Sequence, residues 1–250
     1  RKEKMPSVEQ KVEIIACTPC PEALVATAAR LCYSASSVAD LHDKTTKKDQ
    51  SDFINRLTQM GHASTFEHAG FTFAIEGVSR ALLAQITRHR IASFSVQSQR
   101  YVNQNREGES IRYVIPPSIR ALGEKAVEEY ASQMRQMTRW YGEWVRALGA
   151  KGESANEDAR FVLPNACETR MIVTMNVREL LHFFALRCCN RAQWEIRALA
   201  WRMLELCLDK APNLFDSAGP ACVRGACPEG KMSCGRMDEV RENHARIKER

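Results

Sequence analysis

The sequence predicts a single mixed α/β (α+β) domain in which two long helices accompany a small sheet. Two long stretches repeat apolar residues at steps of three and four, which is typical of amphipathic helices, and several short stretches alternate apolar and polar residues as strands do. A chain of 250 residues with 44% hydrophobic and 26% charged residues can bury one sizeable core. We place the domain at residues 1–215 and assign 216–250 to a Cys-, Gly- and Pro-rich segment with a charged tail.

In the first third of the chain, the sequence predicts a strand, two helices and a second strand. Val12 begins a short β-rich stretch, and residues 21–32 are expected to form a helix with Pro21 in its first turn. Another helix is expected at 48–60. The polar segment 61–70 (GHASTFEHAG) then leads into residues 71–75, whose alternation is that of a half-buried strand. The histidine-rich turn therefore lies between a helix and a strand.

The next part of the chain predicts a capped helix and a short strand. Ser79 can cap a helix that runs through ALLAQITRHR and ends near the polar segment 93–100. Residues 112–115 are expected to form a strand that the two prolines at 116–117 end.

The first long helix is expected from Ser118 to Leu148, with Gly149 and Gly152 ending it. At 1.5 Å per residue it would be about 45 Å long. Its stripe of aromatic and methionine residues favours packing against another long helix, in this chain or in a neighbouring subunit. Packing against the core of its own domain is the alternative, and the sequence leaves both open.

The second long helix follows a third strand. Residues 171–175 alternate as a strand, and Asn176 with Glu179 three residues later forms a capping-box pattern. The helix is expected to continue through LLHFFALRCCNRAQWEIRALAWRMLELCL. The charged end, EVRENHARIKER, is either a solvated helix or a frayed terminus.

Composition excludes several classes of protein. No apolar run approaches the roughly 20 residues of a membrane-spanning helix, and the first twenty residues lack the apolar stretch of a secretory signal. Ten cysteines without short even spacing indicate reduced thiols. With 36 basic and 30 acidic residues the chain is not polybasic. We therefore expect a cytoplasmic protein without a membrane or nucleic-acid partner.

A group of arginines and serines predicts an anion site. Arg88-His89-Arg90 is followed within ten residues by Ser93, Ser95, Ser98 and Arg100, and Gln85, Arg88 and His89 are expected on one helical face by their offsets of three and four residues. Guanidinium groups and hydroxyls at such a junction can bind a phosphate and the polar edge of a base. The alternative is a solvated helix end whose arginines face the helix dipole.

Three further arginines extend this pattern: Arg160, Arg178 and Arg187. Arg178 and Arg187 are nine residues apart, so on one helix they point to opposite faces. Either one of them is an ordinary surface arginine, or the helix lies between two ligands, as it would in an oligomer. The apolar neighbours of Arg187 indicate a partly buried charge, which requires a partner.

Other motifs favour no metal site. His62 and His68, with Glu67 between them, lack the helical spacing of a zinc protease, so a capped turn is expected. Cys222, Cys227 and Cys234 have gaps of four and six residues instead of the two typical of zinc knuckles, and we expect reduced cysteines that pack a loop. The chain also lacks a glycine-rich phosphate loop, GxSxG and a cysteine beside an activating histidine.

The arginine motif also supports a resemblance to a known family. Arg88-His89-Arg90, seven residues, then Ser98 resembles the signature of the flavin-dependent thymidylate synthases. GHASTFEH and FTF stand upstream of it, and ARFVLP, NVREL, LR and AQWEI stand downstream, in the order of that family from about residue 12 to residue 215.

The resemblance implies the fold peculiar to that family and a homotetramer with four active sites at subunit junctions. It implies bound FAD and the conversion of dUMP to dTMP. Methylenetetrahydrofolate would supply the carbon, NADPH would reduce the flavin, and reduced FAD, rather than an enzyme cysteine, would begin the reaction.

The resemblance also assigns residues. Arg187 is expected to be catalytic, against the uracil edge, where it would favour loss of the N3 proton. The residues expected to face the flavin are Ser64, Arg88, His89, Arg90, Asn176, Arg178 and His182. Those expected to hold dUMP are Gln85, Arg88, Ser98, Gln99, Arg100, Arg160 and Arg187. Arg178 on flavin and Arg187 on nucleotide would explain why they point to opposite faces of one helix.

Two positions depart from the family pattern. Many members carry Asn-Glu where this chain has Ser95-Val96, so a carboxylate that would touch both ligands is absent and only the Val96 backbone remains. His182 replaces an Asn found in some members and keeps a hydrogen-bonding group.

A binding module for RNA or DNA is the alternative function. Its affinity would fall steeply as salt rises, whereas a pocket for one phosphate would lose little.

Overall fold

The structure is a computed structural model that describes residues 7–104, 110–149 and 153–249. Gly152, expected to help end the first long helix, lies outside these ranges. Within them the chain forms one sheet of four strands. In hydrogen-bonded order the strands are β1 (Lys11–Cys17), β2 (Gly70–Ser79), β4 (Glu168–Asn176) and β3 (Ala92–Val96).

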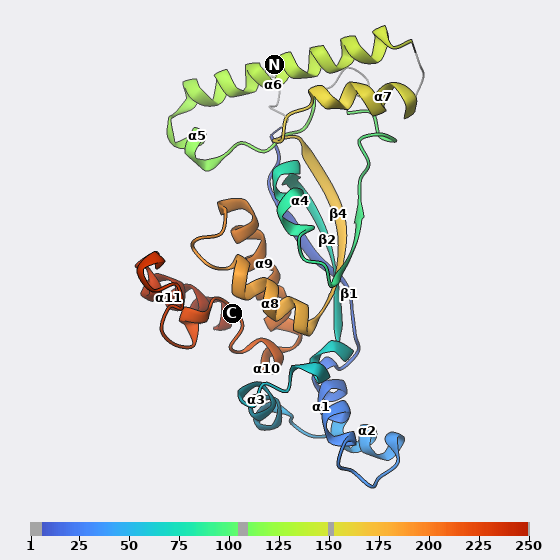
Figure 1. Cartoon of the computed structure of the whole chain (residues 1–250), viewed down its shortest axis with the longest axis vertical. Coiled ribbons are helices and arrows are strands. Elements are labelled where there is room, and N and C mark those ends of the chain that lie inside the picture. The colour runs from blue at the N-terminus through green and yellow to red at the C-terminus, as the bar shows by residue number, and fades with distance from the viewer. Residues whose placement is uncertain (1–6, 105–109, 150–152, 250) are drawn as a thin grey trace. The chain divides into compact units, whose positions relative to one another are not determined.

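Helices account for most of the remaining described chain (Figure 1). The α-helices are α1 (Pro21–Leu31), α2 (Val38–Thr46), α3 (Ser51–Gln59), α4 (Arg80–Ile86), α5 (Pro117–Ala121), α6 (Glu124–Ala147), α7 (Glu153–Ala159), α8 (Val177–Arg187), α9 (Trp194–Lys210), α10 (Pro212–Phe215) and α11 (Met237–Lys248). Short 3₁₀ helices are η1 (Ala63–His68), η3 (Arg160–Val162), η4 (Ala221–Val223) and η5 (Gly230–Met232). The mixed helix-and-sheet class predicted from the sequence is confirmed.

Contacts divide the chain into two compact units, with boundaries inside each strand and one in the loop between α4 and β3. Unit 1 comprises Arg1–Lys11, Ile75–Arg88 and Ser95–Ile172, and unit 2 comprises Val12–Ala74, His89–Phe94 and Val173–Arg250. The segment 216–250, which we assigned separately from residues 1–215, belongs to unit 2, and the division at residue 215 stays a prediction.

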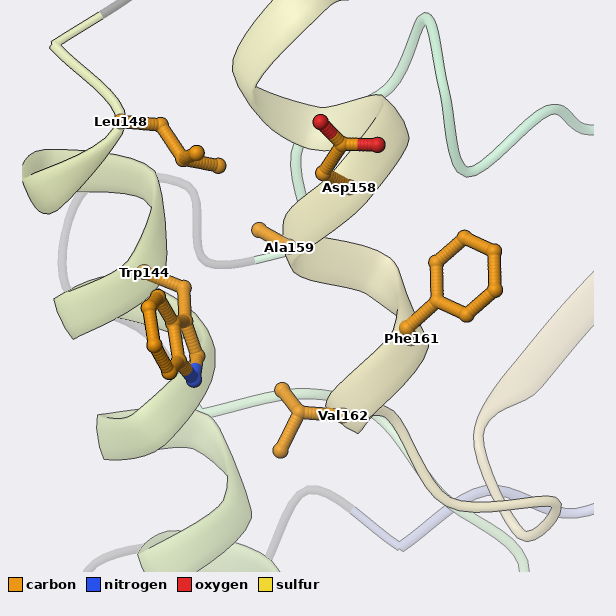
Figure 2. A pocket seen from close by; sticks show the side chains of 6 residues that line it. All are labelled: Trp144, Leu148, Asp158, Ala159, Phe161 and Val162. Carbon is orange, nitrogen blue, oxygen red and sulfur yellow. The ribbon is translucent and has the colours of Figure 1, made fainter.

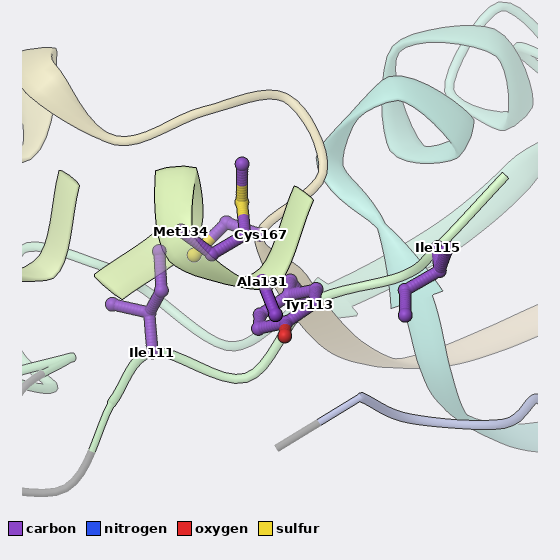
Figure 3. Close-up of a cluster of buried hydrophobic side chains, with 6 residues drawn as sticks. All are labelled: Ile111, Tyr113, Ile115, Ala131, Met134 and Cys167. Atoms are coloured by element: carbon purple, nitrogen blue, oxygen red, sulfur yellow. The ribbon is translucent and has the colours of Figure 1, made fainter. Parts of the chain in front are cut away.

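The core of unit 1 forms where α6 packs against the segment before α5. Tyr113 is buried at the centre of a cluster with Met134 and Cys167, as Figure 3 shows, and its ring meets that of Tyr130 edge-on at 6.0 Å. Such edge-to-face pairs add about 0.5–1.5 kcal/mol to the burial of each ring. Farther along α6, Tyr141 is fully buried and donates a hydrogen bond to Asn156 of α7 at 3.0 Å.

The core of unit 2 contains a chain of buried phenylalanines. Phe183 and Phe184 of α8 meet edge-on at 5.7 Å, and Phe184 meets Phe215 of α10 at 5.9 Å. Phe71 of β2 contacts the same Phe215 ring at 5.6 Å. These contacts fix α8 against the strand face of unit 2, and α8 carries three of the predicted site residues.

A glycine in β2 permits a close backbone approach within unit 1. Gly77 has φ +68, and a Cβ there would lie 1.9 Å from the carbonyl oxygen of Glu9. Its N–H donates to the carboxylate of Glu168 at 3.2 Å. Only glycine combines this backbone angle with such a short approach.

Two helix predictions were wrong in their extent. The second long helix is interrupted: α8 ends at Arg187, Cys188 caps it, and α9 begins again at Trp194, where the side chain of Gln193 accepts from two N–H groups of the first turn. The helix expected to run through Arg88 and His89 ends earlier, because α4 stops at Ile86. The site motif is therefore a loop, and Gln85, Arg88 and His89 do not share a helical face.

Smaller differences concern turns and strands. The first long helix divides at Gly123, whose φ of +97 separates α5 from α6. The strand expected at 112–115 reduces to two isolated bridges of Tyr113, with Ser7 and Cys167. The polar segment after the arginine motif forms β3, and residues 38–46 form α2; neither element was expected from the sequence. The charged tail forms α11, so the helical alternative is confirmed.

Candidate active site

His89 is at the centre of the polar cluster in unit 2. Its side chain is 3% exposed, and its Nδ1 lies 2.9 Å from Oε1 of Glu179, which is buried on α8. On its other side, Nε of Arg187 donates to Nε2 of His89 at 3.1 Å. The rings of His182 and Phe183 meet His89 edge-on at 5.9 and 5.0 Å. One imidazole thus connects the carboxylate of Glu179 to the guanidinium of Arg187.

This arrangement defines the protonation state of His89. Because Arg187 can only donate, Nε2 of His89 must accept, and the ring proton lies on Nδ1, where it is donated to Glu179. Burial lowers the pKa of His89 below its ordinary value, and the positive charge of Arg187 adds to this, while the bond to Glu179 opposes it. His89 is therefore neutral at pH 7 and holds Arg187 in one orientation.

The other predicted flavin residues of unit 2 lie around the start of α8. Asn176 caps this helix by accepting from the N–H of Glu179 at 2.9 Å, as the sequence predicted. The carboxylate of Glu179, expected to return to the cap, contacts His89 instead. Arg178 is exposed and forms an ion pair with Glu67 of η1, the 3₁₀ helix that also carries the exposed Ser64. Arg90 and His182 are exposed as well.

In unit 1 the predicted nucleotide residues gather around α7. Arg100 forms ion pairs with Glu153 and with Glu157, the latter at 3.1 Å. Nε of Arg160 donates to the carbonyl oxygen of Glu157 at 3.0 Å. The Arg100 backbone N–H donates to the hydroxyl of Ser98 at 3.2 Å. The structure therefore brings Ser98, Arg100 and Arg160 to one region and shows acidic partners that the sequence analysis did not identify.

Gln99 differs from its neighbours because it is buried. Gln99 is only 9% exposed, its amide lies beside the thiol of Cys167, and within the described chain Nε2 makes no hydrogen bond of normal geometry. An unpaired buried amide costs about 1–3 kcal/mol, so a ligand oxygen at this position would stabilise the fold. Gln85 is half-buried on α4, where its amide donates to the carbonyl of Ala81 at 3.2 Å. Arg88 is exposed and is the last residue of the second segment of unit 1.

The residues missed from the sequence share one property: each is an acid that contacts a predicted site residue, Glu179 the neutral His89 and the other two Arg100. Glu179 is in NVREL and was assigned to a cap, and Glu153 and Glu157 precede Arg160. Glu153 and Glu157 are more than fifty residues from Arg100 in sequence, so no local pattern relates them to it. The one available signal was the need of a partly buried arginine for a partner.

No cysteine in this region has the character of an activated nucleophile. Burial raises the pKa of Cys167 to about 11, and it raises the pKa of Cys188 and Cys207 as well. Thiols with raised pKa values are inert at neutral pH. This agrees with the absence of a cysteine beside an activating histidine in the sequence.

An apolar pocket of about 290 Å³ lies between α6 and the start of η3. Figure 2 shows Trp144 of α6 and Leu148, which caps that helix, facing Ala159 and Val162, with Asp158 at the edge. Trp144 is 56% exposed and Phe161 is 84% exposed. Such large exposed apolar side chains mark a surface that contacts another molecule. No helix in the described part of the chain is both long and apolar enough to span a bilayer.

Comparisons with known proteins relate most of the chain to one family. The family described as "Thymidylate synthase complementing protein" matches residues 13–213. A protein of Geobacter sulfurreducens named flavin-dependent thymidylate synthase is 52% identical over 231 residues, which cover 92% of this chain and 96% of that protein. One of Clostridium tetani with the same name is 46% identical over 245 residues, covering 93% and 96%.

A solved structure gives the same likeness. The flavin dependent thymidylate synthase ThyX from Helicobacter pylori, complexed with FAD and dUMP, matches with a TM-score of 0.61 at 26% identity. The match covers 84% of this chain and 99% of that one.

Proposed function

The chain belongs to the family of flavin-dependent thymidylate synthases, and from that premise we propose that it methylates dUMP reductively to dTMP, with FAD bound and with methylenetetrahydrofolate and NADPH as co-substrates. One observation carries the assignment of residues: the guanidinium of Arg187 is held by a neutral His89, which Glu179 holds in turn. A cation fixed in this way can act on a substrate without reorganising first.

The donor groups present fit a flavin dinucleotide and a nucleotide monophosphate. Both ligands carry phosphates and a ring with a polar edge, which require guanidinium forks, hydroxyls and amides. The exposed side chains of Arg90, Arg178 and Ser64 offer such groups in unit 2. In unit 1, the amide of Gln99 is buried with an unsatisfied donor. FAD, when bound, would supply the hydride for the reduction; the residues of unit 2 would hold it, and Gln99 would hold the nucleotide.

Our proposal separates binding from catalysis among the arginines. Arg88, Arg90 and Arg178 bind the flavin, together with Ser64, Asn176 and His182. His89, buried behind Arg187, acts mainly by orienting it, which refines the expectation that His89 touches the flavin. Arg187 binds the uracil edge and stabilises the negative charge that develops when the N3 proton is lost.

The nucleotide phosphate requires a change of partners in unit 1. Arg100 is paired with Glu153 and Glu157, so in our proposal the phosphate of dUMP competes with these carboxylates for the guanidinium. Arg160, Ser98 and Gln99 lie within the same stretch of unit 1 and supply the remaining donors, with Gln85 and Arg88. The carboxylates keep the arginines oriented before the anion arrives.

The active form is proposed to be a homotetramer. The support is the exposed apolar surface on α6 and η3, where Trp140, Trp144 and Phe161 are 45%, 56% and 84% exposed. Exposed aromatic groups of this size are typical of subunit interfaces. Light scattering should give the mass of four chains, and a monomer mass in the presence of FAD would contradict the proposal.

Flavin retention tests the assignment of Arg90. Arg90→Ala should lower the affinity for FAD by about 10- to 100-fold, because one charge-assisted hydrogen bond contributes about 1.5–3 kcal/mol. The measurement is flavin occupancy after dialysis, read from the visible absorption. Arg246→Ala, an exposed arginine of α11, is the matched control and should retain FAD as the parent does. Equal occupancy in the Arg90 variant would remove it from the flavin site.

A further inference from the structure

The turn after α8 lies against the C-terminal segment of unit 2. Arg191 forms an ion pair with Glu229. Two residues before Arg191 is Cys189, and two residues before Glu229 is Cys227. The ion pair therefore joins two turns that each carry a cysteine, although 38 residues separate them in sequence.

A second anchor fixes the rest of the segment. Cys222, in η4, is 7% exposed, and its carbonyl oxygen accepts from Nε of Arg241 at 2.9 Å. The same guanidinium donates to the carbonyl of Gly225 at 3.0 Å. Arg241 belongs to α11, which packs against η4 and α9. Cys234 lies between η5 and α11, so the loop from 222 to 234 is attached at both ends to the same helix region.

The four thiols occupy one neighbourhood. Burial raises the pKa of Cys222, and electrostatic interaction with Cys189, Cys227 and Cys234 raises it further. All four cysteines are free, and the last three are only partly buried, so they are open to a ligand. The remaining six cysteines take no part in this group.

We propose that Cys189, Cys222, Cys227 and Cys234 together bind one zinc ion. Four thiolates arranged tetrahedrally are a common structural ligand set for zinc, with Zn–S distances of about 2.3 Å. Each thiol loses its proton to water as a Zn–S bond forms. This replaces the expectation from sequence that the segment holds no metal, which rested only on gaps of four and six residues.

Binding requires the thiols to converge. In residues 7–104, 110–149 and 153–249, no three Cys, His, Asp or Glu side chains already surround a common point as metal ligands. The ion pair of Arg191 and the hydrogen bond of Arg241 hold the turns, and zinc binding in our proposal requires the cysteine side chains to rotate until their sulfurs share one ion. The glycines at 230 and 235 have positive φ values and supply the tight turns between Cys227 and helix α11.

The site has a structural role that is distinct from the family's chemistry. Three of its ligands lie after residue 213, the last residue that the family match includes. The segment between α10 and α11 has only short 3₁₀ helices, and a metal would supply the stability that regular structure does not provide there. Zinc would also fix the turn that begins one residue after Arg187, at the C-cap of α8.

The test is metal analysis of the full, flavin-loaded protein. Cells are grown with added zinc, and zinc and iron are measured per chain by mass spectrometry. We expect about one zinc and no iron, because a Cys₄ site binds one ion. Cys227→Ser and Cys234→Ser should each lose most of the zinc, whereas Cys32→Ser, an exposed cysteine outside the group, should keep it.

A second measurement needs no substitution. Cobalt(II) added to the metal-free holoprotein should give the visible bands of tetrahedral thiolate coordination in a difference spectrum against the same flavoprotein. Zinc should then abolish these bands and protect four thiols from a thiol reagent. Zinc below about one-tenth per chain without cobalt bands, iron in place of zinc, or equal zinc in the Cys227 variant and the parent would each overturn the proposal.

Discussion

Arg187→Ala should leave FAD bound and reduce turnover by about 10²- to 10³-fold, the effect of removing one preorganised group that stabilises developing charge. Arg187 donates to a neutral, buried His89, so its guanidinium is held in place before the substrate binds. A group that acts mainly on the transition state should change kcat more than the binding of dUMP.

Two further variants sharpen this test. Arg187→Lys keeps the charge but loses the planar fork, so it should recover only part of the turnover. Arg202→Ala, an exposed arginine on α9 paired with Glu205, is the control and should leave turnover unchanged. The measurements are kcat and the dissociation constant of dUMP for flavin-loaded protein. Near-normal kcat in Arg187→Ala would remove this residue from the mechanism.

Glu179→Ala should be the second most damaging change, in stability as well as turnover. It leaves the buried Nδ1–H of His89 without an acceptor, which costs about 1–3 kcal/mol. It also removes the group that keeps the proton on Nδ1, and the other tautomer cannot accept from Arg187. We expect a lower unfolding midpoint and a kcat that approaches that of Arg187→Ala. A stable variant with normal turnover would contradict this positioning role.

Glu179→Gln separates positioning from charge. Its amide oxygen can still accept from His89, so most of the turnover should remain at neutral pH. The carboxylate raises the pKa of His89, so its removal should shift the acid limb of the kcat profile to lower pH. A limb that does not move, or moves upward, would show that His89 does not govern it.

The pH dependence of stability follows from the same residue. The pKa of His89 is lowered on folding from its ordinary value of 6.5, chiefly by burial. Between the two values the unfolded chain binds a proton that the folded chain does not. The contribution of His89 to stability is therefore complete above about pH 6.5 and is lost as the pH falls toward the folded pKa.

Local patterns predicted the elements whose signals are local. Asn176 caps α8, Pro21 begins α1, and the periodic stretch after Ser118 forms α6. The prediction of one uninterrupted second helix was wrong. The apolar spacing continues through residues 188–193, but the side chain of Gln193 caps a new helix there. The spacing of apolar residues carries no information about a helix cap that a polar side chain such as Gln193 provides.

The site residues came from the motif, and their partners came only from the structure. The sequence predicted that Arg187 needs a partner, but His89 lies 98 residues away and no spacing identifies it. The same holds for Arg100 with Glu153. The family resemblance, carried by the arginine motif and its flanking blocks, is confirmed by the match over residues 13–213. The role of each residue stays a prediction.

The measurement that tests the central claim most directly is the visible absorption spectrum of the purified protein. It is recorded after FAD is added and excess removed by desalting, and again after dUMP is added. The account predicts a retained flavin band whose shape changes with dUMP, because both ligands occupy one site. No retained flavin under any condition, or a flavin band that dUMP leaves unchanged at saturation, would contradict it.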